Sequence, residues 1–195
     1  MTRAEYAAIF IGIVVGLGLT NILASVHKLM EAKGRVRWDW LAPAMAINAI
    51  LLTLGTFWHQ WVQMQRAPQG PHSFLSTLPT ASAFLLLYLA CAATLPDEVP
   101  EAGANLRGYY FDNRRRIWGL FCATFGLYLS SWAIGFARFH SIERLRINAA
   151  VILMSMGGFL LSILSLTVRA VWWHRIAVVA LAVLLLAVYG PMLLP

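Results

Sequence analysis

The chain reads WLAPAMAINAILLTLGTFWHQWVQMQ over residues 40–65, a run without one Asp, Glu, Lys or Arg. A helix needs roughly 20 mostly apolar residues to cross the roughly 30 Å hydrocarbon core of a bilayer. Trp40 and Trp61 lie toward the two ends of the run, where tryptophan commonly marks the boundary between membrane and water. The run therefore predicts a membrane-spanning helix.

Outward from this run, the rest of the chain repeats the same pattern. Five further uncharged stretches cover residues 6–26, 67–96, 117–137, 147–168 and 176–195, and the 15 basic and 8 acidic side chains fall in the gaps. We expect one all-α, polytopic transmembrane domain over residues 1–195, with six spans at about 6–26, 40–64, 73–95, 117–137, 147–168 and 174–194. With 60% hydrophobic residues, such a chain has no room for a soluble catalytic domain.

The net charge of +7 would suggest nucleic acid in a soluble protein, but in a membrane protein it reports topology. Five basic residues fall on one side of the predicted spans, and ten on the other. The ten are Lys28, Lys33, Arg35, Arg37, Arg107, Arg114, Arg115, Arg116, Arg169 and Arg175. The positive-inside rule places these ten in the cytoplasm and both termini outside, and we expect no nucleic-acid partner.

The longest connection, residues 97–116, is predicted to be a cytoplasmic loop with a short interfacial helix. Tyr109 and Tyr110 would lie at headgroup depth. Arg114, Arg115 and Arg116 would face anionic lipid.

A weak internal similarity relates the two halves of the chain. Ile47-Asn48-Ala49 is followed by Gly55, and Ile147-Asn148-Ala149 is followed by Gly157. Two units of three helices must enter the membrane from opposite sides, so the similarity suggests an inverted 3+3 repeat, which is common in transporters.

Polar residues within the spans are the candidates for contact with a solute. Asn48, His59 and Gln63 follow one side of the second span, and Asn148, Ser155 and Ser162 follow one face of the fifth. Glu5 and Asn21, near the two ends of the first span, complete the set. The alternative is structural: Asn bridges helices, Ser bonds to its own helix, and Glu5 pairs with Arg3, Arg66 or Arg138.

Gly12, Gly16 and Thr20 recur at every fourth position of the first span. Such a stripe lets another helix approach closely, either within the subunit or in a homo-oligomer, most simply a dimer.

Signatures of enzymes and cofactors are missing. The chain has no GxSxG, Walker or HExxH motif, and Cys91 and Cys122 have no metal-type spacing. His59 and His140 are both predicted to lie near the outer face of the membrane, at a depth that would allow them to hold a haem between them. Histidines without metal-ligand spacing, however, are usually ordinary loop residues. We expect no metal, no cofactor and no enzymatic activity.

Several segments carry a resemblance: residues 4–21, the pair Phe57-Trp58, residues 89–96, and Leu106 to Phe111. Together they resemble a group of small bacterial membrane proteins known chiefly as hypothetical proteins. The resemblance implies six helices in a bacterial inner membrane, and it transfers neither an activity nor functional residues.

The leading functional hypothesis is permeation of a small solute or ion, because the repeat and the two polar faces are features of transporters. The alternative is a sensor, scaffold or accessory subunit that acts by protein contact within the bilayer. A haem protein or another membrane enzyme comes third.

Overall fold

The computed structural model describes residues 3–32, 34–66, 74–139 and 142–193. These residues form α1 (Arg3–Glu31), β1 (Val36–Arg37), α2 (Leu41–Arg66), α3 (Phe74–Thr94), β2 (Ala104–Asn105), α4 (Leu106–Phe139), α5 (Ile142–Thr167) and α6 (Val171–Leu193). The predicted all-α class is confirmed for this part of the chain.

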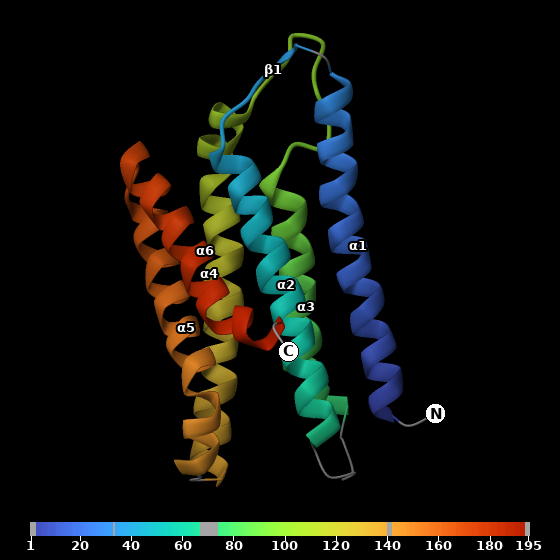
Figure 1. Ribbon diagram of the computed structural model, residues 1–195, viewed down its shortest axis with the longest axis vertical. Helices are drawn as coiled ribbons and strands as arrows, with labels where there is room; N and C mark the ends of the chain where they lie inside the picture. Colours follow the sequence, from blue (N-terminus) through green and yellow to red (C-terminus); the bar gives the residue numbers. More distant parts are fainter. Residues whose placement is uncertain (1–2, 33, 67–73, 140–141, 194–195) are drawn as a thin grey trace.

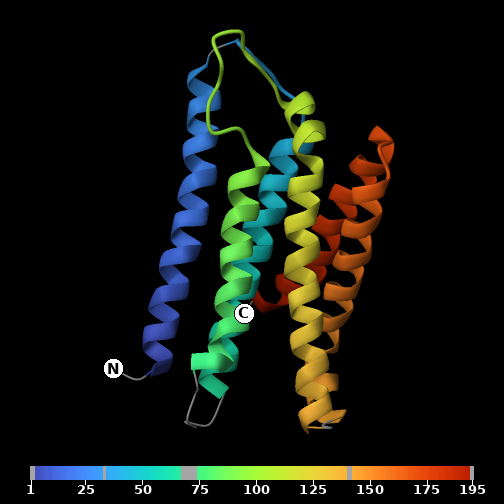
Figure 2. The ribbon, with the colours of Figure 1, turned by 180° about the vertical axis from the view of Figure 1, so that it is seen from behind.

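The helices run up and down along one long axis, with β1 and β2 at one end (Figures 1 and 2). Five of the described helices contain segments long and apolar enough to cross a membrane, namely Ala8–Glu31, Leu41–Gln63, Leu106–Ile134, Asn148–Thr167 and Val171–Pro191. The apolar part of α3, Leu78–Thr94, is shorter. Both the composition and the arrangement suggest a multi-pass membrane protein.

The outer surface of the bundle is apolar. Leu23, Leu153 and Val183 are each more than 60% exposed, whereas Asn48, Ser155 and Ser162 are fully buried. In water, exposing so many large apolar side chains would cause association. In lipid the same surface has no such penalty, and polar groups gain by pairing inside the bundle.

Two connections interlock at the end of the bundle that carries the strands. We call residues 34–40 and 95–105 the loop cap. β1 and β2 pair in parallel, with Val36 opposite Ala104. Gly103 has φ +92°, and a Cβ there would overlap the Arg35 carbonyl oxygen, which accepts a 3.0 Å hydrogen bond from Ala104 N. Lys28 Nζ adds a 2.8 Å hydrogen bond to Asp97 O.

The segment before residue 117 differs from the prediction of a loop with its own interfacial helix. Asn105 Oδ1 accepts from Arg107 N at 3.2 Å and from Gly108 N at 3.3 Å, so α4 begins at Leu106 with a standard cap. α4 then continues for 34 residues to Phe139. Residues 106–116 are therefore the first turns of a long helix.

The expected lipid-facing residues of this segment separate into two groups. Tyr110 is fully buried, which corrects its placement at headgroup depth, and Tyr109 is half-buried with its hydroxyl donating to Leu95 O at 2.9 Å. Arg115 and Arg116 are exposed, and half-buried Arg114 donates to Phe111 O. The tyrosines face inward because they pack this end of α4 onto the bundle.

α6 ends beside α2 and α3, short of the far ends of α4 and α5 (Figures 1 and 2). Near this end Tyr189 lies against Gly55 of α2, where a Cβ would overlap the tyrosine ring. Tyr189 also lines the pocket described below.

Candidate ligand pocket

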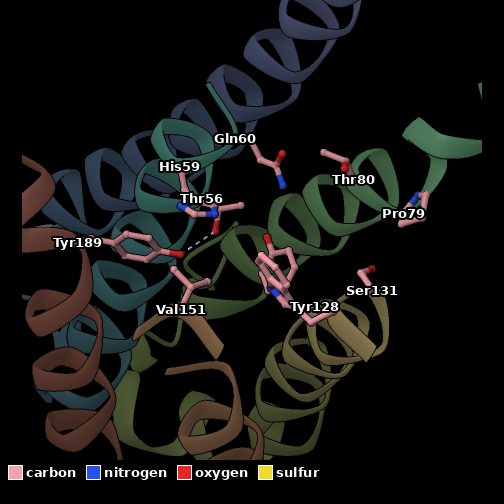
Figure 3. Close-up of a pocket in the computed structure, with 10 residues that line it drawn as sticks. Thr56, His59, Gln60, Pro79, Thr80, Tyr128, Ser131, Val151 and Tyr189 are labelled. Atoms are coloured by element: carbon pink, nitrogen blue, oxygen red, sulfur yellow. Dashed lines mark hydrogen bonds between the residues drawn. The ribbon is translucent and has the colours of Figure 1, made fainter. Parts of the chain in front are cut away.

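A partly open pocket of about 240 Å³ lies in the half of the bundle opposite the loop cap (Figure 3). It is lined by Thr56, His59 and Gln60 of α2, Pro79 and Thr80 of α3, Tyr128, Ser131 and Trp132 of α4, Val151 of α5, and Tyr189 of α6. Five helices thus contribute to one cavity. Gln60 is six residues from the end of α2, which is about 9 Å at 1.5 Å per residue.

Helix geometry explains why these side chains converge. Thr56, His59 and Gln60 stand at i, i+3 and i+4 on α2, so they share one face. Tyr128, Ser131 and Trp132 have the same spacing on α4. The two faces point toward each other across the pocket.

Three hydroxyl groups come together at the inner end. Thr56 Oγ1 and Tyr189 Oη share a hydrogen bond of 3.4 Å. The Tyr128 hydroxyl points into the same space (Figure 3), is buried, and has no hydrogen-bond partner among the described residues. A buried hydroxyl without a partner costs about 1–3 kcal/mol, so the fold retains an unfavourable group here.

The pocket is uncharged and combines polar groups with a larger apolar wall. None of its described lining residues is an Asp, Glu, Lys or Arg. Hydroxyl, amide, imidazole and indole groups supply donors and acceptors, and the aromatic rings supply apolar walls. This combination is typical of a small-molecule site.

Among the predicted solute-facing residues, His59 lines the pocket. Gln63, one turn further along α2, donates from Nε2 to Asn148 Oδ1 at 3.0 Å and so joins α2 to α5. The structure therefore brings three predicted residues, His59, Gln63 and Asn148, into one region, although Gln63 and Asn148 interact with each other.

The remaining polar candidates hold helices together. Asn48 is fully buried and donates from Nδ2 to Val178 O at 2.9 Å, which links α2 to α6. Ser155 and Ser162 are fully buried and donate to carbonyl oxygens of their own helix, at 2.8 Å and 2.7 Å. These contacts match the structural alternative for all three.

The first helix, α1, contributes none of the described residues that line the pocket. Asn21 is half-buried, and the side chain of Glu5 lies outside the described part of the chain. A Cβ at Gly12 or Gly16 would meet nothing within 4 Å, whereas one at Gly18 would contact Cys91 and Tyr88. Close packing within the subunit therefore uses Gly18, and the stripe of Gly12, Gly16 and exposed Thr20 faces outward.

A second buried polar cluster lies near the loop cap and was not anticipated. His174 Nε2 is 3.0 Å from Val168 O, and because a carbonyl only accepts, this nitrogen carries the proton. In the neutral ring Nδ1 then accepts from Tyr110 Oη at 3.0 Å, and Tyr110 Oη accepts from Trp118 Nε1 at 2.9 Å. Each polar atom has a partner, so the cluster is a packing device.

Among the described residues, no three His, Cys, Asp or Glu side chains come together in a group that could hold a metal ion. His140, the second member of the conceivable haem pair, lies outside those residues.

Comparison with protein families, with curated proteins and with solved structures found no match. The pocket is therefore the feature of this protein from which a function can be inferred.

Sequence reasoning missed most of the lining residues. Tyr128, Tyr189 and Thr56 are of residue types that are common in membrane helices, and none stands out alone. The available signal was the pair of i, i+3, i+4 polar faces, at 56–59–60 and at 128–131–132.

Proposed function

We propose that this chain is a six-span membrane carrier that binds a small solute in the pocket between α2, α4 and α6. The observation that carries the proposal is the buried Tyr128 hydroxyl, which has no hydrogen-bond partner among the described residues and lies in a cavity lined by polar groups from four helices and by Val151 of a fifth. An unsatisfied group of this kind is retained at a cost in stability, which is understandable where a ligand completes it.

The other half of the bundle is densely packed, which favours a carrier over an open channel. Phe121, Phe125 and Leu181 are fully buried between the pocket and the loop cap. The loop cap then covers that end through the pairing of β1 with β2. A solute that crosses must wait for this half to open, as in alternating access.

The proposed route differs from a path along Asn48 and Asn148. Both asparagines are engaged in contacts between helices, so the pocket replaces the two polar faces as the proposed solute site. The inverted repeat is not needed either. α1 packs mainly on α3, whereas its counterpart α4 packs mainly on α5, so the helix pairing differs between the halves.

Six crossings, with the loop cap in the cytoplasm of a bacterium and both termini outside, are part of the proposal. α3 starts at the end where α2 finishes, and it leads into the loop cap at the other end (Figure 1). If α2 and α4 cross the inner membrane, α3 has to cross it as well. Arg35, Arg37 and Arg107, on or beside the loop cap, fit the positive-inside rule.

The test is solute uptake into proteoliposomes, using variants that differ at adjacent positions. Ser131 lines the pocket and Ser130 does not, yet both are exposed and both donate to Leu127 O. Ser131→Trp should fill the pocket and abolish uptake, and Ser130→Trp should transport like the wild type. Equal uptake by the two variants would contradict the proposal.

A second candidate is a sensor or accessory subunit that binds a solute and does not transport it. The densely packed half and the ordered loop cap favour it, because both offer a rigid surface for protein contact. Solute binding without uptake, lost in Ser131→Trp, would identify this function.

A further inference from the structure

We infer that the ligand of this pocket is an uncharged molecule built on one aromatic ring with a hydrogen-bond-accepting substituent. The inference rests on the proposed function of the pocket as a solute site. It adds the size, the charge and the anchoring group of that solute.

The volume of the pocket limits the size of the ligand. An engineered cavity of about 150 Å³ holds a benzene molecule. The present pocket of about 240 Å³ therefore has room for one ring and a substituent of a few atoms. Larger, multi-ring ligands would require the helices to separate.

The walls favour an aromatic ring. Tyr128, Trp132 and Tyr189 line the pocket together with the imidazole of His59, and Figure 3 shows Tyr128 and Tyr189 projecting into it from different helices. Aromatic rings pair in edge-to-face or offset arrangements, which adds to the gain from burial alone. Four ring-bearing side chains around so small a space provide such partners on several sides.

The lining favours a neutral ligand. Its described residues include no Asp, Glu, Lys or Arg that could neutralise a bound ion. Moving an unpaired charge out of water into a membrane protein is strongly unfavourable. An anion or cation of the same shape should therefore bind much more weakly.

The anchor is the Tyr128 hydroxyl. Its oxygen is buried and makes no hydrogen bond of standard geometry, because the nearby Thr56 hydroxyl bonds to Tyr189 instead. The O–H of Tyr128 is thus available to donate to a carbonyl oxygen on the ligand. That bond would satisfy a group that no described residue pairs with.

Three probes that share one ring and differ in charge test this inference: benzamide, benzoate and benzylamine. Binding to the full-length protein in detergent is measured by equilibrium dialysis of labelled probes, with protein-free micelles subtracted. Benzamide should bind at least about tenfold more tightly than either ion, a difference of about 1.4 kcal/mol.

Two tyrosine variants locate the bound benzamide. Tyr128→Phe removes the anchoring hydroxyl and should weaken benzamide binding about fivefold to tenfold. Tyr88→Phe is the control, since Tyr88 is a half-buried residue of α3 outside the pocket. It should bind benzamide like the wild type.

Preference for benzoate or benzylamine would overturn the neutral ligand while leaving the pocket as a solute site. Absence of benzamide binding, or equal binding by Tyr128→Phe and wild type, would overturn the ligand class and the anchor. The proposed function is judged separately, by uptake in Ser131→Trp and Ser130→Trp.

Discussion

At the scale of single residues, the account depends on which buried polar groups have partners. Ser155, Ser162 and Thr124 donate to carbonyl oxygens of their own helices, and Asn48 donates to α6. The Tyr128 hydroxyl and the Asn48 amide oxygen are both buried without a hydrogen-bond partner among the described residues, but only the Tyr128 hydroxyl belongs to the pocket lining. The bonded side chains therefore stabilise the bundle, whereas the Tyr128 hydroxyl is available to a ligand.

Tyr128→Phe is expected to stabilise the protein without ligand. Removing an unsatisfied buried hydroxyl while keeping the ring should add up to about 1 kcal/mol to the free energy of unfolding. The apparent melting temperature in detergent measures this change, with Tyr88→Phe as the control. A lower melting temperature would show that the hydroxyl has a structural partner.

Tyr110→Phe is expected to have the opposite effect. The change leaves Trp118 N–H and His174 Nδ1 without a partner, at about 1–3 kcal/mol for each buried group. The double variant with Trp118→Phe should lose less than the sum of the two single losses, because the two residues share one bond. Additive losses in melting temperature would refute this coupling.

Residue type alone was a poor guide to the site. Asn48 and Asn148 were selected because amides are rare in apolar spans, but Asn48 bonds to Val178 and Asn148 to Gln63. Tyr128 attracts no notice in the sequence, since what distinguishes it is a missing partner. That property depends on the packing around the pocket, where Gly55 admits the ring of Tyr189.

At the scale of elements, the uncharged runs predicted the helices well, because hydrocarbon requires every backbone group to pair within a helix. The exception is α4. Its first turns carry Arg114 to Arg116, which suggested a loop, yet Tyr110 and Trp118 form a buried side that continues the helix toward the loop cap. A charged exposed face and an aromatic buried face together explain why the helix begins at Leu106.

The loop cap allows a matched test of strand pairing. Gly34 and Gly103 both have positive φ, +81° and +92°, but only at Gly103 would a Cβ overlap a backbone oxygen, that of Arg35. Gly34→Ala should cost about 1–2 kcal/mol for the left-handed backbone alone. Gly103→Ala should cost clearly more and lower the melting temperature further. Equal effects would mean that the pairing of β1 with β2 adds nothing to stability.

At the scale of the whole molecule, we expect two copies to associate through α1. Gly12 and Gly16 have open space above them, and Thr20 is exposed on the same stripe. Replacing both glycines by Leu should convert a dimer into a monomer without lowering the melting temperature of the subunit. Light scattering in detergent measures the mass. A wild-type monomer, or a dimer that survives the change, would contradict the prediction.

The central claim is that a membrane-embedded bundle contains a solute pocket reached from the end opposite the loop cap. The most direct measurement is labelling of Ser131→Cys by a membrane-impermeant maleimide, in a chain with Cys91 and Cys122 replaced by Ala. Ser131→Cys should react from the outer face of the membrane only, and Ser130→Cys, which we expect to face lipid, should not react. Labelling of Ser131→Cys from the cytoplasmic face, or equal labelling at both positions, would contradict the account.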